Sequence, residues 1–150
     1  MPNKFFPVSI DLNNKNVLVI GAGKIALRKV ETLLSYNCKI FVVTKTIEEE
    51  KFLDLEQENK IKILLNQEFD ESLLKDVFLV VVATNNEELN LNISKLCMRK
   101  NILVNNITSK DDMNLRFMSI CEKEDIQIGV SAKGNPKKAV EIKKMIEKII

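Results

Sequence analysis

The segment from Asn16 to Val30 constrains the fold of this chain more than any other part of the sequence. It begins with an apolar run that ends at Ile20, passes through the glycine-rich turn 21–23, and continues at once with apolar residues at helical spacing. A short continuous apolar run is typical of a strand buried on both faces of a parallel sheet. A Gly-x-Gly-x-x-Ala pattern between such a strand and a helix predicts a dinucleotide-binding turn. The alternative, a tight turn that binds nothing, is less favoured because strand, turn and helix occur in the required order.

Each small residue of this turn has its own role in the prediction. Gly21 permits the tight reversal from strand to helix, and Gly23 lets the backbone come close to a pyrophosphate. Ala26 lets the helix pack closely on the strand. The unpaired N–H groups at the helix N-terminus are expected to bind the phosphates. The predicted cofactor-binding residues of the turn are Gly21, Ala22, Gly23, Lys24 and Ile25.

Apolar runs alternate with helical patterns up to about residue 113. The most apolar run, 77–84, is predicted to be the central strand. Asn85 and Asn86 are of the type that caps a helix, and they precede an apolar helical face. This alternation predicts a Rossmann-like, doubly wound parallel sheet of the α/β class. We also expect an extra strand at Pro7–Leu12 and a helix within the acidic stretch 47–59. The five predicted parallel strands are 16–20, 39–43, 61–65, 77–84 and 102–105.

The pattern changes after about residue 113. Segments 115–121 and 126–131 predict a hairpin, and Asn135-Pro136 predicts the start of a last helix. A hairpin and one helix are too small to bury a core alone, so we expect packing on the sheet domain or on a second copy. The predicted division is an NAD-binding Rossmann domain, 1–113, and a dimerisation segment, 114–150, in a homodimer. The apolar stripe of the last helix consists of Ile142, Met145, Ile146 and Ile149.

The composition excludes several classes of protein. The 150 residues are 45% hydrophobic and 29% charged, as in ordinary globular chains. No apolar run approaches the roughly 18 residues of a membrane helix, and no signal peptide is evident, so we expect a cytoplasmic protein with no membrane partner. A net charge of +2 does not predict nucleic-acid binding. Three widely spaced cysteines predict reduced core thiols. The chain has no histidine, so we predict no tight transition-metal site.

Ligands of open parallel sheets bind beyond the carboxyl ends of the strands, where the strand order reverses. We expect that point between the first and fourth strands. The second strand ends without the acidic residue that commonly binds the ribose of NAD. Lys45 beside a 2′-phosphate and backbone amides beside a ribose both fit this pattern, although a solvated loop lysine is the more common explanation of Lys45. The choice between NAD and NADP stays open. The strand-end residues that complete the predicted cofactor site are Thr44, Lys45, Thr84, Asn85 and Asn105.

A set of motifs occurs in one order along nearly the whole chain. It comprises segment 7–12, the glycine turn with the Ala-Arg-Lys trio that follows, run 82–85, segment 102–105, and turn 131–136 before a basic helix. Together these motifs resemble the precorrin-2 dehydrogenase domain of siroheme synthases. The resemblance implies a homodimeric oxidoreductase that uses NAD to oxidise precorrin-2 to sirohydrochlorin in siroheme, and hence porphyrin, biosynthesis. It also implies metal insertion, a lyase activity, in some relatives.

The residues expected to carry the chemistry depart from the family pattern. Thr108 stands where the family usually has an Asp proposed to handle protons, and a threonine hydroxyl is a poor general base. Asp111 and Asp112 are the nearest carboxylates that could replace it, so all three are candidate catalytic residues. Solvated loop aspartates explain the latter pair equally well. Many relatives continue with a helical region over the tetrapyrrole cleft, whereas this sequence stops at Ile150.

The implied substrate is a polycarboxylate, which cationic side chains would bind. The candidate substrate-binding residues are Arg28, Arg116 and Lys133, and no metal-binding residues are predicted. The leading hypothesis is an NAD-dependent precorrin-2 dehydrogenase. The alternative is a dinucleotide-binding regulatory or assembly module without turnover. A ferrochelatase that has lost its oxidase role fits less well, because the glycine turn is intact.

Overall fold

The chain forms two compact units, which divide between Leu115 and Arg116. A computed structural model describes residues 2–150. The division falls two residues beyond the boundary predicted after residue 113. Each unit is described by itself below.

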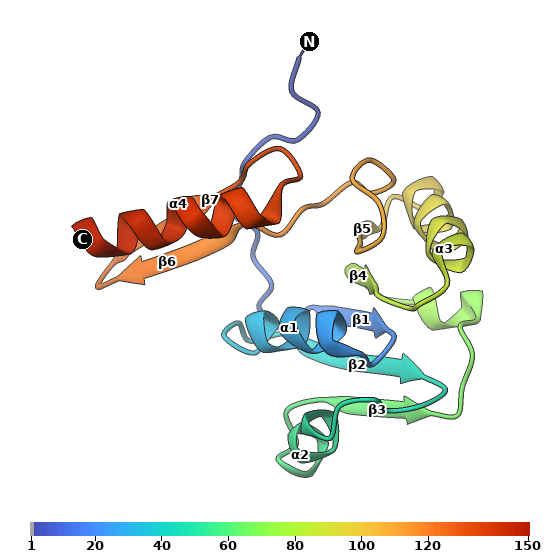
Figure 1. Cartoon of the computed structure of the whole chain (residues 1–150). Helices are drawn as coiled ribbons and strands as arrows, with labels where there is room; N and C mark the ends of the chain where they lie inside the picture. The colour runs from blue at the N-terminus through green and yellow to red at the C-terminus, as the bar shows by residue number, and fades with distance from the viewer. Residues whose placement is uncertain (1) are drawn as a thin grey trace. The chain divides into compact units, whose positions relative to one another are not determined.

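The first unit is built on a parallel sheet with the strand order β3-β2-β1-β4-β5 (Figure 1). The order reverses between β1 and β4, as predicted, because β1 pairs with both β2 and β4. At this centre Val19 lies opposite Val42 on one side and Val81 on the other. The strands are β1 (Asn16–Ile20), β2 (Lys39–Thr44), β3 (Lys62–Leu65), β4 (Leu79–Val82) and β5 (Leu103–Asn106).

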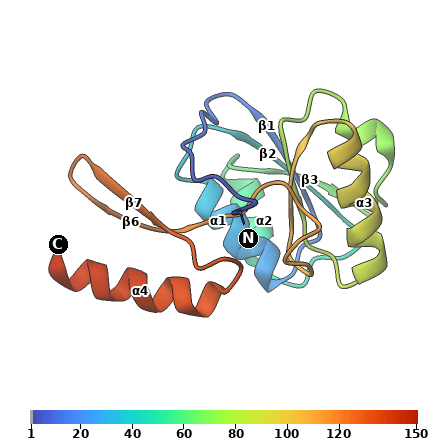
Figure 2. The ribbon, with the colours of Figure 1, turned by 90° about the horizontal axis from the view of Figure 1, so that it is seen from above.

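Helices cover both faces of this sheet. Figure 2 shows α1 and α3 on opposite sides of the strands. The side chain of Asn86 caps α3 by accepting a hydrogen bond from Leu89 N, as the sequence predicted. The helices of this unit are α1 (Lys24–Leu33), α2 (Lys51–Gln57), the short 3₁₀ helix η1 (Glu71–Leu74) and α3 (Glu87–Arg99).

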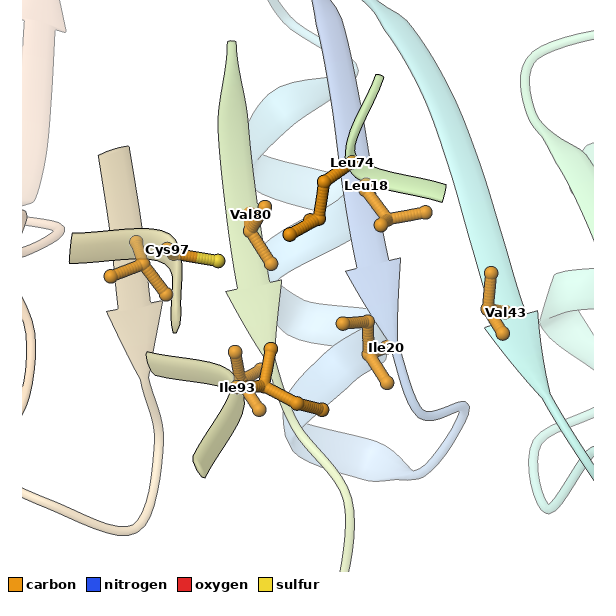
Figure 3. Packing of buried hydrophobic residues seen from close by; sticks show 9 residues of the cluster. Leu18, Ile20, Val43, Leu74, Val80, Ile93 and Cys97 are labelled. Atoms are coloured by element: carbon orange, nitrogen blue, oxygen red, sulfur yellow. The ribbon is translucent and has the colours of Figure 1, made fainter. Parts of the chain in front are cut away.

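The core between α3 and the sheet is made of aliphatic side chains. Figure 3 shows residues from β1, β2 and β4 on one face with Ile93 and Cys97 of α3 against them, and the ribbon of α1 behind the strands. Every residue of β4 is buried, as expected for a strand with a neighbour on each side. The prediction that this strand is the central one is corrected, because β1 occupies the middle of the sheet and β4 lies between β1 and β5. Burial also raises the pKa of the Cys97 thiol to about 11. Cys38, Cys97 and Cys121 are free thiols.

Two predicted elements are corrected by the structure. Residues 7–12 form no strand, and Val8 and Ile10 on this segment are exposed. Alternation alone was misleading there, because the segment has no neighbouring strand with which to form a ladder. The acidic stretch is helical only from Lys51 to Gln57. Its first residues form a loop instead, because Glu48 N donates to Ala22 O (3.4 Å) and ties the loop to the glycine turn.

The second unit is an antiparallel hairpin and a helix, as the sequence predicted. β6 (Ser119–Lys123) pairs with β7 (Ile126–Val130), and α4 (Pro136–Ile149) follows. Asn135 caps α4 by accepting from Lys138 N at 3.1 Å, and Pro136 occupies the first turn. On α4 only Ala139 is fully buried, whereas Met145 and Ile149 are 59% and 84% exposed. The hairpin of the same unit therefore leaves much of the apolar stripe uncovered.

Across residues 2–150, we find no helix with the length and hydropathy needed to cross a membrane.

Candidate dinucleotide-binding site

The first glycine of the turn is required by a close backbone contact. Gly21 has a φ of +112°, which L-residues with side chains rarely adopt. A Cβ atom at this position would lie 2.2 Å from Ala83 O, in the segment that follows β4. The turn is held in place because Gly21 N donates to Val43 O at 2.9 Å. Gly21 thus lets the ends of β1 and β4 approach each other at the switch point.

The second glycine opens the N-terminus of α1. Gly23 is the N-cap residue, and no side chain makes a cap hydrogen bond there. The first turn of α1 also carries no acidic residue. The leading N–H groups of a helix have no intrahelical partners, and they attract anions together with the helix dipole. This turn therefore has the backbone features of a phosphate site, and Lys24 and Ile25 are exposed beside it.

A glutamate that the sequence analysis did not select lies against this turn. A Cβ atom on Gly23 would lie 3.1 Å from Oε2 of Glu48. The other carboxylate oxygen, Oε1, accepts a hydrogen bond from Asn85 Nδ2 at 3.4 Å. Glu48 thus connects the loops that follow β1, β2 and β4.

The end of β2 differs from the arrangement suggested for a 2′-phosphate. Thr44 is buried, and its hydroxyl donates to Thr46 O at 2.5 Å. Lys45 is exposed and forms a salt bridge with Glu68, with 2.6 Å between Nζ and Oε1. The hydrogen bond from Lys45 and its positive charge lower the pKa of the Glu68 carboxyl. The ammonium group of Lys45 is therefore already paired with an anion.

A buried amide on α3 joins the ends of β4 and β5. The side chain of Asn90 is fully buried. Its Oδ1 accepts from the N and Oγ1 of Thr84, and its Nδ2 donates to Thr84 O (3.0 Å) and to Thr108 Oγ1 (3.2 Å). The Thr108 hydroxyl in turn donates to Asn106 Oδ1 at 2.9 Å. Thr84 and Thr108 are thus brought together by Asn90, and the hydroxyl proton of Thr108 is engaged.

The two aspartates after β5 fold back on their own loop. Asp112 Oδ2 accepts a hydrogen bond from Ser109 Oγ at 2.9 Å, and Ser109 Oγ accepts from Asp112 N and Asp111 N. Asp111 O accepts from Lys4 Nζ at 2.5 Å. Asp111 is exposed and Asp112 is half-buried. The carboxylate of Asp112 therefore helps to hold its own loop through the hydrogen bond from Ser109.

The predicted residue at the end of β5, Asn105, is buried and partly unsatisfied. Its Nδ2 donates to Leu115 O at 3.1 Å, while its Oδ1 has no hydrogen-bond partner. The neighbouring Asn106 also has a buried Nδ2 without a partner. Buried amide groups normally find partners, so these two groups can still form a hydrogen bond with a water or a ligand at the end of β5.

The predicted substrate-binding cations belong to different units. Arg28 is exposed on α1 of the first unit, next to Lys29, whose pKa is lowered by burial. Arg116 and Lys133 belong to the second unit. Lys133 has a φ of +50° in the turn that precedes α4. No cluster of three or more potential metal ligands occurs within residues 2–150.

Two residues of the site were missed by sequence reasoning, and each left a signal. Asn90 lies three residues before Ile93 and seven before Cys97, so it is a polar residue on the buried face of α3. Glu48 lies only four residues beyond the end of β2. The usual pattern places the acidic residue at the strand end itself, whereas Glu48 stands in the loop beyond it.

The glycine turn fits a dinucleotide on structural grounds. Among residues 2–150, and apart from its chain neighbours, a Cβ atom on Gly23 would come within 4 Å of the flexible carboxylate of Glu48 alone, so there is open space beside the start of α1. The exposed helix N-terminus supplies N–H donors for a pyrophosphate, and the strand order places it at the switch point.

Comparisons with known proteins agree with this geometry. The NAD(P)-binding family model NAD_binding_7 matches residues 8–119. The siroheme synthase of Mannheimia succiniciproducens is 35% identical over 130 residues, which are 87% of this chain and 27% of that protein. The siroheme synthase of Pseudoalteromonas translucida is 32% identical over 148 residues, which are 98% of this chain and 31% of that protein. The chain thus spans less than a third of the length of these two relatives.

A solved structure is also similar over almost the whole chain. The structure described as SirC, precorrin-2 dehydrogenase, matches with a TM-score of 0.82 and 26% identity, covering 97% of this chain and 71% of that one. The match includes both the sheet unit and the hairpin-helix unit, since it leaves only 3% of the chain uncovered. With its glycine turn in place at the switch point, this chain belongs to the NAD(P)-binding family NAD_binding_7, and its relatives are siroheme synthases and a precorrin-2 dehydrogenase.

Proposed function

We propose that this chain catalyses the NAD-dependent oxidation of precorrin-2 to sirohydrochlorin, a step of siroheme biosynthesis. The observation that carries the proposal is the similarity to a precorrin-2 dehydrogenase structure over 97% of the chain. The glycine turn at the switch point supports the same activity, because it provides backbone donors where a dinucleotide pyrophosphate binds. The siroheme synthases among its relatives support the pathway.

Apart from the proton acceptor, the site residues of this chain bind and orient. NAD supplies the hydride acceptor when it is bound. The start of α1, with Lys24 and Ile25, would hold the pyrophosphate. The hydrogen bonds of Asn90 hold the ends of β4 and β5 in one arrangement, which fixes the residues beside the reacting groups.

A proton must leave precorrin-2 together with the hydride. Thr108 is a positioning residue in this proposal, because its hydroxyl donates to Asn106 and accepts from Asn90. The carboxylates of Asp111 and Asp112 are the acidic groups closest to it in sequence that can accept a proton. We assign them this role, and we assign Arg28, Arg116 and Lys133 to the carboxylates of the substrate.

The exposed stripe on α4 supports a homodimer. Its members Ile142, Met145 and Ile149 are 37%, 59% and 84% exposed. Contiguous apolar surface of this kind marks a protein interface. A second copy of the same hairpin and helix would cover it in a two-fold symmetric contact.

The activity is tested by supplying precorrin-2 and NAD under anaerobic conditions. We expect formation of NADH in step with sirohydrochlorin, measured by absorbance. Gly23→Val should abolish both products while circular dichroism remains unchanged, because the side chain would stand where the pyrophosphate binds. NAD binding without any turnover would contradict the enzyme proposal and favour the alternative, a dinucleotide-binding regulatory or assembly module. The engaged hydroxyl of Thr108 is the feature that favours this alternative.

A further inference from the structure

The position of Glu48 carries an inference about cofactor choice, which rests on the proposed dinucleotide-binding function. Glu48 lies in the loop between β2 and α2, and its backbone N–H donates to Ala22 O at 3.4 Å. This hydrogen bond folds the loop back onto the glycine turn. A glutamate that follows β2 is thereby brought to the point where β1 ends.

The carboxylate of Glu48 lies against the glycine turn. Its Oε2 lies 3.1 Å from the position of a Cβ atom on Gly23, and its Oε1 accepts from Asn85 Nδ2 at 3.4 Å. The group therefore borders the same backbone that a dinucleotide must approach. A carboxylate only accepts hydrogen bonds, and the adenosine ribose of NAD offers two adjacent hydroxyl donors.

The charges around the loop oppose a 2′-phosphate. Lys45, the cation at the end of β2, is paired with Glu68 at 2.6 Å. Glu68 itself follows β3. The loop 45–50 carries three further carboxylates, those of Glu48, Glu49 and Glu50, and Lys45 is the one cation of that loop. NADP would bring a further phosphate dianion next to this excess of negative charge. NAD would bring a neutral ribose with donors for the carboxylate.

We propose that Glu48 accepts hydrogen bonds from the adenosine ribose hydroxyls and makes this site selective for NAD over NADP. An acidic residue after the second strand has this role in many dinucleotide-binding folds, where it usually stands about 20 residues beyond the glycines. Here the loop supplies it four residues beyond the end of β2. Glu48 is a specificity-determining residue, and the chemical step does not involve it.

The experiment compares NAD and NADP binding by isothermal titration calorimetry in the full chain. The variants are Glu48→Gln and, as a matched control, Glu50→Gln. Glu50 is an exposed glutamate two residues away that makes no side-chain cap hydrogen bond at α2. Circular dichroism of each variant checks that the fold is retained.

We expect the unmodified protein to bind NAD at least tenfold more tightly than NADP, where tenfold corresponds to about 1.4 kcal/mol. Glu48→Gln should weaken NAD binding about tenfold and strengthen NADP binding, while Glu50→Gln changes neither. The same pattern should appear with the fragments 5′-AMP and 2′,5′-ADP, because the proposed contact is to the adenosine ribose.

Other outcomes overturn the inference in distinguishable ways. If Glu48→Gln tightened NAD and NADP equally, the carboxylate would act only by repelling the pyrophosphate. If Glu48→Gln left the affinities for NAD and NADP unchanged, Glu48 would not bind the ribose. Tighter binding of NADP than of NAD by the unmodified protein would show the same. A protein that bound NAD selectively through Glu48 but failed to oxidise precorrin-2 would support the inference and refute the proposed activity. A protein that bound neither dinucleotide would refute both.

Discussion

Adding one methyl group at Gly21 should destabilise the fold strongly. In Gly21→Ala the new Cβ would lie 2.2 Å from Ala83 O, 2.7 Å from Ala83 C and 3.1 Å from Thr84 N. All three atoms belong to the backbone, so no side chain can turn away to make room. Overpacking in a core costs about 1–3 kcal/mol, and a positive φ costs an L-residue about 1–2 kcal/mol more.

We therefore expect Gly21→Ala to lower the free energy of unfolding by about 2–5 kcal/mol, a large share of the 5–15 kcal/mol of an ordinary domain. Urea unfolding followed by circular dichroism measures this loss. The matched control is Gly23→Ala, where the added Cβ meets only the flexible carboxylate of Glu48 at 3.1 Å. That change should cost about 1 kcal/mol or less, chiefly because alanine is a poorer N-cap than glycine. Equal losses in the two variants, or a loss below about 1 kcal/mol in Gly21→Ala, would refute the close contact with β4.

Three further predictions concern the polar network, the dimer and the chemistry. Asn90→Ala should cost about 2–4 kcal/mol in urea unfolding, because it leaves buried polar partners unsatisfied; a loss below about 1 kcal/mol would contradict the network. Met145→Asp should shift a dimer to monomers in light scattering, since an unpaired carboxylate is costly in an apolar interface, and an unmodified protein that is monomeric at tens of micromolar would refute the interface. Thr108→Asp should raise the rate of precorrin-2 oxidation, by up to about 10²–10⁴-fold where the geometry permits general base catalysis. NADH formation that is no faster in this variant would place the proton acceptor elsewhere.

Much of the sheet unit could be predicted from local pattern. The continuous apolar runs of β1 and β4 predict strands buried on both faces, and both strands are buried from Val17 to Ile20 and from Leu79 to Val82. The N-caps Asn86 and Asn135 were predictable for a similar reason, because an N-cap bonds to an N–H only a few residues ahead. Such features depend on neighbours in sequence, so the sequence contains the information needed to predict them.

The failures occurred where distant segments decide the outcome. Pro7–Leu12 alternates like a strand, but a strand exists only when another strand pairs with it, and none does here. The helix expected from about Ile47 starts only at Lys51, because the preceding loop is hydrogen-bonded to the glycine turn.

By itself, the sequence determined the strand–turn–helix that binds a dinucleotide, the order of the elements and the family resemblance. Each of these depends on residues that are close in sequence, because backbone geometry and hydrophobic periodicity are local properties of the chain. Only the tertiary structure decided that Glu48 faces Gly23 and that Asn90 joins Thr84 to Thr108. The parallel sheet brings the carboxyl ends of β1, β2, β4 and β5 to one edge, so residues far apart in the chain meet there. The hydrogen bonds between such residues depend on their distance in space, which a local sequence pattern does not specify.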